Sequence, residues 1–111
     1  MIDFDEFARI DMRVGRVLEV RPFPEARKPS YQLRIDFGAE LGERVSSAQL
    51  TVTYPDPSGL VGRQVVAVVN FPPRRIAGFR SEVLVLGAVG TSGEVHLLRP
   101  EPECEEGMRV G

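Results

Sequence analysis

Three arginines lie close together in one short segment of this chain, and they are the side chains best suited to chemistry. Arg74, Arg75 and Arg80 fall within the segment 70–82, alongside two prolines and a glycine. Guanidinium groups bind carboxylates and phosphates through paired, charge-assisted hydrogen bonds. The segment could therefore hold an anionic ligand on a stiff loop. The alternative is a solvated loop whose arginines pair with the neighbouring Glu82.

Aromatic and amide side chains accompany these arginines. Phe71 and Phe79 stand on either side of them. They could stack on nucleobases, at about 1–3 kcal/mol per base, or line an apolar groove for a peptide. Asn70 ends the preceding aliphatic run, and its amide could donate to a ligand or cap the turn. Cations, rings and an amide on one loop favour a binding role.

Uncharged polar side chains form a second group, on a strand predicted over residues 44–50. Ser46, Ser47 and Gln49 could contact amide or base edges by hydrogen bonding. The ordinary polarity of a surface strand explains them equally well. We retain all three as candidate ligand contacts.

Two further arginines lie on a long first strand predicted over residues 12–22. The period-two pattern places Arg16 on the apolar face with Val14, and Arg13 on the opposite face with Val17. An unpaired charge among apolar side chains is costly. Arg16 therefore either pairs with a buried carboxylate or lies at the mouth of a barrel, whereas Arg13 is a candidate for ligand contact.

Groups that could break bonds are scarce. The chain has one histidine, His96, and one cysteine, Cys104, so it offers no histidine pair, no internal disulfide and no cysteine metal cluster. The serines lack the strand-turn-helix elbow and the histidine partner that nucleophilic catalysis requires. We expect no catalytic residue, no metal site and no cofactor.

Short apolar stretches predict the elements that must position these side chains. A short helix is expected to begin after Asp3 and end near Arg9. Residues 51–62, broken by prolines and glycines, are expected to form a loop with one helical turn. The predicted strands cover 12–22, 31–37, 44–50, 64–69, 83–87 and 95–98, with a turn at 38–42 and a hairpin turn at 91–94. Leu33, Ile35 and Phe37 are expected to point inward, and the strands 64–69 and 83–87, apolar on both faces, are expected to be buried on both sides.

Strands of this number and spacing predict an all-β protein with a five-stranded OB-fold barrel. A short N-terminal helix and C-terminal extension strands complete it. The expected organisation is a single domain over residues 1–111. Within it, 1–11 hold the helix, 12–98 the barrel and 99–111 the extension.

Composition sets the broad class. The 111 residues include 14 basic and 16 acidic side chains, for a net charge of −2, so the protein is not coated in positive charge. No apolar run approaches the roughly 18 residues of a membrane helix, and the N-terminus is acidic. We expect a cytoplasmic protein that does not insert into membranes.

Several motifs resemble the stand-alone tRNA-binding domain, an OB-fold found appended to bacterial methionyl-tRNA synthetase. They occur in the family's order and span nearly the whole chain. The matching pieces are Asp11–Val17, Asp36–Gly38, Val66–Asn70, Pro73 with Arg74, Gly78 and Ser81. The resemblance implies tRNA as one class of partner.

Three stretches resemble more narrowly the CsaA family of export-related chaperones within that group: Pro24–Pro29, Ser46–Gln49 and Asn70–Phe79. The chain departs from the general tRNA-binding pattern at Phe23, where that pattern has a histidine nearby, and at Pro29, where it has a leucine. The resemblance implies a homodimer without catalysis that holds unfolded or precursor polypeptides. The alternative is a structure-specific tRNA-binding protein.

The resemblance and the residue types together give one set of predicted sites. The predicted peptide- or RNA-binding residues are Arg13, Lys28, Ser46, Ser47, Gln49, Asn70, Phe71, Arg74, Arg75, Phe79, Arg80 and Ser81. Dimerisation through the N-terminal helix and the C-terminal extension would involve Phe4, Phe7 and Met108. Phe4 and Phe7 share one face of a short helix, which independently suggests that this face needs covering.

Overall fold

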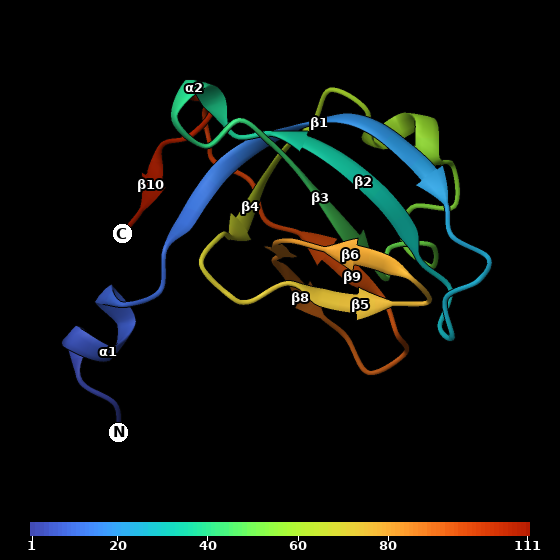
Figure 1. Ribbon diagram of the computed structural model, residues 1–111, viewed down its shortest axis with the longest axis horizontal. Helices are drawn as coiled ribbons and strands as arrows, with labels where there is room; N and C mark the ends of the chain where they lie inside the picture. The colour runs from blue at the N-terminus through green and yellow to red at the C-terminus, as the bar shows by residue number, and fades with distance from the viewer.

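A long first strand organises the barrel. The computed structural model describes residues 1–111, with β1 (Met12–Pro22) at the centre of the main sheet (Figure 1). The first half of β1 pairs with β4 (Gln64–Val68) and its second half with β2 (Tyr31–Asp36). The sheet continues from β2 to β3 (Glu43–Ala48) and from β4 to β7 (Leu84–Val85), giving the order β3-β2-β1-β4-β7.

The barrel closes where β3 meets the chain just before β7. The backbone N–H of Glu82 donates to the carbonyl of Val45 at 2.8 Å. The buried Ser46 hydroxyl donates to the carbonyl of Val83 at 3.0 Å. These contacts make the sheet a nearly closed five-stranded barrel, which confirms the predicted all-β OB-fold with a short N-terminal helix.

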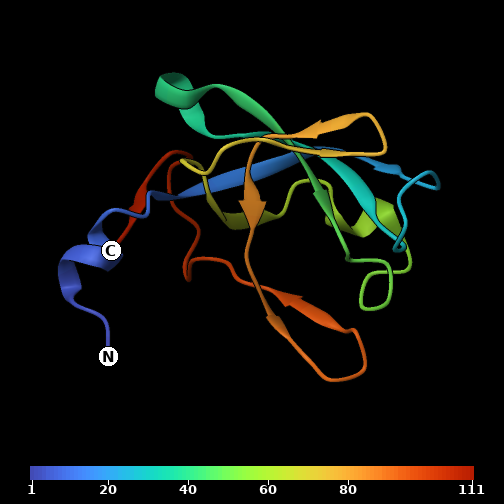
Figure 2. The same ribbon diagram turned by 60° about the horizontal axis from the view of Figure 1, so that its bottom comes forward.

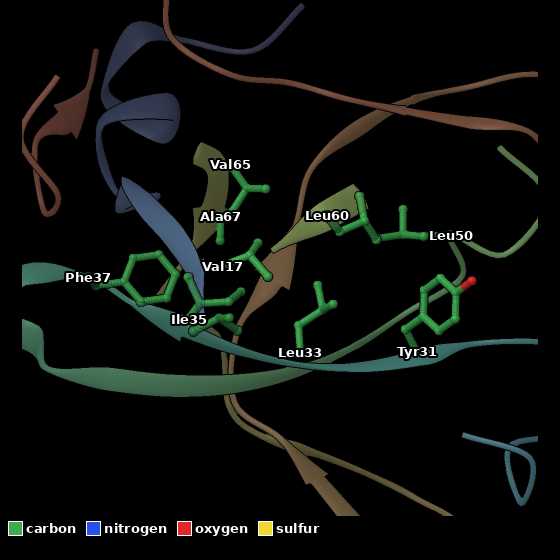
Figure 3. Packing of buried hydrophobic residues seen from close by; sticks show 10 residues of the cluster. Val17, Tyr31, Leu33, Ile35, Phe37, Leu50, Leu60, Val65 and Ala67 are labelled. Carbon is green, nitrogen blue, oxygen red and sulfur yellow. The ribbon is translucent and has the colours of Figure 1, made fainter. Parts of the chain in front are cut away.

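The core fills this barrel from β2 and β4. Leu33, Ile35 and Phe37 alternate inward as predicted, and they meet side chains of β4 such as Val65 (Figure 3). Each of β4's five residues is buried. The prediction that β4 is covered on both faces is therefore confirmed.

The period-two pattern placed Val14 and Val20 on the core side of β1, and this holds only for Val20, which packs against the core cluster. Val17 belongs to the core cluster, whereas Val14 is buried outside it, beneath the C-terminal extension. A β-bulge between Val17 and Glu19 breaks the strict alternation, so a period of two does not hold along the strand. Gly15 permits close packing here, because a Cβ would lie 2.6 Å from a methyl carbon of Ile35.

The segment 70–82 is not the loop that its prolines and glycine suggest. It contains a two-stranded antiparallel hairpin, β5 (Arg74–Ile76) with β6 (Phe79–Ser81). A second hairpin, β8 (Gly87–Val89) with β9 (Val95–Leu97), extends away from the barrel (Figure 2). The predicted turn at 91–94 is confirmed as the tip of that hairpin.

The strand predicted over residues 83–87 is also corrected. β7 ends at Val85 and β8 begins at Gly87, so the chain leaves the main sheet within this stretch. Leu84 is 47% exposed, which contradicts the prediction of a strand covered on both faces. The break brings an aliphatic side chain to the surface beside the first hairpin.

Three short helices connect or flank the strands. The N-terminal helix α1 (Phe4–Ala8) projects from the barrel, and the Asp3 N–H donates to the Glu6 carboxylate at 3.2 Å (Figure 1). α2 (Gly38–Leu41) occupies the predicted turn, and η1 (Pro57–Leu60) is the helical turn predicted in the loop before β4. No helix has the length and apolar character needed to cross a membrane.

The C-terminal extension is fastened to the end of the barrel. Its last strand, β10 (Arg109–Val110), pairs with the start of β1. Gln64, 1% exposed, donates from Nε2 to the Cys104 carbonyl at 2.6 Å and to the Glu106 carboxylate at 2.7 Å. Its Oε1 accepts from the Cys104 N–H at 3.1 Å. One buried amide thereby fixes the course of the acidic tail.

Candidate ligand-binding surface

The arginine hairpin, defined as residues 74–81, is a rigid platform. Its strands are joined by the two-residue turn Ala77-Gly78, in which both residues have positive φ, 47° and 82°. This conformation matches the twist of paired strands and makes a tight hairpin. Ala77 adopts this left-handed backbone conformation although residues that carry a Cβ disfavour it. The arginines are thus carried on an ordered ribbon.

The pairing divides the hairpin side chains between two faces. Arg75 lies directly opposite Arg80, and both are exposed. Arg74 lies opposite Ser81, and Ile76 opposite Phe79, and this face holds the buried and half-buried members of the hairpin. Because successive strand residues alternate in direction, Arg75 and Arg80 point away from the barrel.

Hydrogen bonds from β3 fasten the hairpin to the barrel. The Ser47 N–H donates to the Ser81 hydroxyl oxygen at 3.0 Å. The Val45 N–H donates to the Glu82 carboxylate, also at 3.0 Å. The hairpin therefore cannot swing freely, and the Ser81 hydroxyl and the Glu82 carboxylate are both engaged with backbone.

The three hairpin arginines have no acidic partner. The salt bridges of the protein involve other arginines, namely Arg13, Arg16, Arg21 and Arg34. The one hydrogen bond of the hairpin guanidinium groups runs from Arg75 Nη1 to the Gly78 carbonyl, at 3.3 Å. Pairing with Glu82, the alternative raised by the sequence, does not occur. The outward face instead sets two like charges opposite each other, an arrangement that an anion would relieve.

An apolar depression, here called the hairpin hollow, lies beside Arg74. It has a volume of about 230 Å³. Phe71, which is 46% exposed, stands at its edge. Its lining includes Phe71, Arg74, Ile76, Glu82, Val83 and Leu84. The sequence did not point to Ile76 or Leu84, because the first lies within a presumed loop and the second within a presumed buried strand.

A second depression, the helix hollow, lies on the other side of Phe71. It measures about 380 Å³ and is lined by Ile2, Glu6, Arg9, Ile10, Asn70 and Phe71. Asn70 accepts from the Asp11 N–H at 3.0 Å and donates to the Arg9 carbonyl at 2.8 Å, which ties the end of α1 to the barrel. The Asn70 amide thus bridges α1 and the barrel instead of capping its own turn, and its contact with a ligand stays a prediction.

Phe79 borders neither of the two depressions that Phe71 borders. Its ring packs edge-on against the buried Phe23, with 5.5 Å between centroids. It also borders a third depression, of about 230 Å³, over β1, β2 and β3. Ion pairs from Glu19 to Arg21 and Arg34 cross this depression, so its charged groups are mutually satisfied. Phe71 is therefore the freer of the two rings.

Arg13 and Arg16 hold the fold rather than face the hairpin. Arg13 contacts the carboxylates of Asp11 at 2.7 Å and Glu40 at 2.8 Å, and these hydrogen bonds raise its pKa. Arg16 contacts Glu103 at 3.2 Å and Glu106 at 3.0 Å. Arg16 does pair with carboxylates, but these are not buried as predicted, since the Glu103 side chain is 63% exposed and that of Glu106 24%. Both partners come from the C-terminal extension.

The remaining predicted contacts separate into buried and exposed groups. Ser46 is fully buried, and its hydroxyl is used in closing the barrel, while Ser47 lines the hairpin hollow. Gln49 and Lys28 are exposed, and neither lines one of the three depressions. The structure thus brings together Ser47, Phe71, Arg74 and Ser81, with Arg75 and Arg80 on the reverse of the hairpin.

The residues predicted for dimerisation are accessible. Phe4 is 77% exposed, and its ring centroid lies 6.2 Å from that of the half-buried Phe7. Met108 is exposed on the C-terminal extension, next to β10. Arg109 donates to the Ala8 carbonyl at 3.0 Å, which links the extension to the end of α1. The surface around α1 is therefore partly apolar.

No three or more histidine, cysteine, aspartate or glutamate side chains gather as a metal site would require. His96 is exposed on β9, and Cys104 is half-buried beside Gln64. The arrangement offers contact surfaces, free cations and apolar depressions.

Most of the chain matches a known protein family. Residues 12–109 match the family described as "Putative tRNA binding domain". The chain is similar to the methionine–tRNA ligase of Parabacteroides distasonis, with 38% identity over 109 residues, 98% of this chain. It spans only 16% of that ligase.

Two solved structures are similar over the whole chain. The chaperone CsaA of Bacillus anthracis has 51% identity and a TM-score of 0.94, with 100% of this chain and 99% of that chain covered. The CsaA chaperone protein of Picrophilus torridus has 47% identity and a TM-score of 0.91, with both chains covered completely.

Proposed function

The chain belongs to the tRNA-binding-domain family, and from that premise we propose that it is a CsaA-like, export-related molecular chaperone. In this proposal residues 1–111 act as one non-catalytic domain in the cytoplasm, holding unfolded or precursor polypeptides. The similarity over full length to two CsaA chaperones supports this reading over that of a synthetase appendage. The surface around Phe71 supplies the physical argument.

The observation that carries the proposal is the position of Phe71 between two depressions. An exposed ring that borders both the helix hollow and the hairpin hollow gives an extended chain successive apolar contacts. Exposed apolar patches of this kind usually mark a binding surface. The hairpin hollow, at about 230 Å³, is below the roughly 300–1,000 Å³ of small-molecule sites, and the helix hollow, at about 380 Å³, is at the low end of that range. Single side chains of a polypeptide suit depressions of this size.

Removing the apolar surface tests the chaperone proposal. Phe71→Ser combined with Leu84→Ser should weaken binding of unfolded, carboxymethylated lactalbumin by about tenfold or more, because two large apolar contacts are lost. Val89→Ser is the matched control, since Val89 is an exposed aliphatic residue on the other hairpin. Unchanged binding by the double variant, measured by fluorescence anisotropy, would remove Phe71 from the proposed surface.

A second candidate function, tRNA binding, is favoured by the unpaired arginines. Family membership supports it, and Arg74, Arg75 and Arg80 offer three free guanidinium groups. If each neutralises one phosphate, the logarithm of the tRNA binding constant should fall with the logarithm of salt concentration at a slope of about −2.7. Binding to the unfolded polypeptide should hold or strengthen as salt rises. A flat salt response for tRNA would exclude phosphate contacts by the hairpin.

We also propose that the protein is a homodimer. The apolar face of α1, with Phe4 and Phe7, and the neighbouring extension with Met108 supply the interface. Phe4→Ser combined with Phe7→Ser should convert the protein to monomer in light scattering, because these rings would otherwise stay exposed to water. A dimer mass retained by that variant would place the interface elsewhere.

A further inference from the structure

The hairpin hollow is bordered by a cation, Arg74, that forms no salt bridge with any carboxylate of the protein. The Arg74 side chain is exposed. The walls contributed by Phe71 and Leu84 are apolar. We propose that this hollow selects polypeptide segments in which a large apolar residue has an acidic neighbour. This inference rests on the proposed chaperone function and defines its substrate class.

Strand register assigns this role to Arg74 and not to the other two hairpin arginines. Arg74 and Ile76 share the barrel side of β5, and both border the hollow. Arg75 and Arg80 occupy the opposite side of the ribbon and do not line it. An apolar side chain seated in the hollow would therefore leave its neighbouring residue within reach of one guanidinium group.

The hollow contains one carboxylate, Glu82, which opposes the charge of Arg74. Glu82 is half-buried, and its carboxylate accepts a hydrogen bond from the Val45 N–H at 3.0 Å, so it is directed toward β3. Arg74 is more exposed and carries its charge toward solvent. The arginine therefore sets the sign of the charge that an approaching ligand meets first.

The size and lining of the hollow favour a single apolar side chain. Its volume of about 230 Å³ lies below the roughly 300–1,000 Å³ of sites for small molecules. Its apolar lining comes from the aliphatic side chains of Ile76, Val83 and Leu84, with Phe71 as the one aromatic ring. The Ser81 hydroxyl at its floor already accepts from the Ser47 N–H. These features suit leucine, isoleucine or phenylalanine better than a nucleobase, which needs stacking surfaces and free polar groups.

Three labelled peptides test the inference. Each holds two leucines, flanked by aspartate and glutamate, by asparagine and glutamine, or by lysines. At about 0.15 M salt the screening length is about 8 Å, so the assay reports charges near the ligand. The wild-type protein should bind the acidic peptide about fivefold more tightly than the amide peptide, as for one exposed ion pair.

Three variants isolate the responsible charge. Arg74→Gln should bind the acidic and amide peptides equally, and Arg74→Glu should prefer the lysine peptide. Glu82→Gln should enlarge the preference for the acidic peptide. Arg75→Gln is the matched control, since its side chain lies on the opposite face of the hairpin, and it should keep the wild-type preference.

The outcomes separate this inference from the function on which it rests. Equal wild-type binding of all three peptides would overturn the acidic selectivity and leave the chaperone proposal standing. Failure to bind any peptide would instead overturn the chaperone proposal itself. A preference that persists unchanged in Arg74→Gln would show that Arg74 is not its source, which also overturns the inference.

Discussion

The barrel and the hairpin use the same residue in opposite ways. On the barrel, Arg13, Arg16 and Arg34 each contact two carboxylates. On the hairpin, Arg74 and Arg80 contact none, and Arg75 has only a carbonyl of its own turn. The presence of an arginine therefore says nothing by itself about function in this protein. The partners present in the folded chain separate structural arginines from those available to a ligand.

The barrel arginines stabilise the ionised form of their partners. The pKa of Glu19 is lowered by hydrogen bonds from Arg21 and Arg34. The pKa of Glu106 is lowered by the Gln64 amide first and by Arg16 in addition. These contacts tie together segments far apart in sequence, above all the C-terminal extension and β1. Charge on the barrel is thus used in holding the fold.

The largest effect is expected from reversing the charge of the arginines on the outward face of the hairpin. Arg75→Glu combined with Arg80→Glu should lower tRNA affinity about a hundredfold near 0.1 M salt, because two phosphate contacts become repulsions. Folding should be unaffected, since the native pair sets like charges opposite each other. Filter binding and thermal melting give the two measurements.

A matched variant of a barrel arginine should change stability and leave tRNA binding unaltered. Arg16→Ala should lower the melting temperature through loss of contacts to Glu103 and Glu106, with tRNA affinity unchanged. If the hairpin double variant destabilised the protein as much as Arg16→Ala does, the distinction between the two groups of arginines would fail.

A smaller effect is expected at the amide that anchors the extension. Gln64→Leu should lower the free energy of unfolding by about 2 kcal/mol, because the N–H and C=O of the half-buried Cys104 lose their partner. Chemical denaturation measures this change. Peptide and tRNA binding should persist, since Gln64 lies apart from the hairpin. A loss of binding without loss of stability would place the extension within the ligand surface.

Acid should weaken the anchorage of the extension in a predictable direction. Because the folded-state pKa of Glu106 is lowered, its contribution is present above the unfolded pKa, which is about 4.3. That contribution is lost as pH falls through the folded pKa. Glu106→Gln should therefore be less stable than wild type at pH 7, with the difference shrinking toward pH 3. A difference independent of pH would show that the carboxylate charge is not involved.

The smallest expected effect concerns the rigidity of the hairpin. Ala77 adopts a φ of 47°, which asparagine tolerates better, and an Asn-Gly pair is the preferred two-residue hairpin turn. Ala77→Asn should raise the free energy of unfolding by about 0.5 kcal/mol. Thermal melting can detect this, with Ala88→Asn on the other hairpin as a control. A decrease would mean that the turn is not of the type described.

The sequence predicted best those features that depend on a local pattern of apolar residues. The alternation of Leu33, Ile35 and Phe37 predicted a half-buried strand, and the unbroken apolar run of β4 predicted full burial. The number and spacing of the predicted strands indicated the OB-fold, and the family resemblance agreed with it. These signals depend on local pattern or on motif order.

Features that depend on distant partners could not be predicted in this way. Whether Arg16 or Arg74 has a carboxylate beside it is decided by segments remote in sequence. The bulge in β1 interrupted the alternation of its core face, and the break after Val85 exposed Leu84. The hairpin was missed because prolines and a glycine resemble a loop, although Ala77-Gly78 occupies the place of a two-residue turn.

Hydrogen exchange measured on the free protein and with excess carboxymethylated lactalbumin tests the central claim most directly. If the surface around Phe71 holds polypeptide, backbone amides over residues 70–84 should exchange more slowly in the complex. Amides of β8 and β9 should be unchanged. Protection confined to β8 and β9, with none over 70–84, would contradict the account.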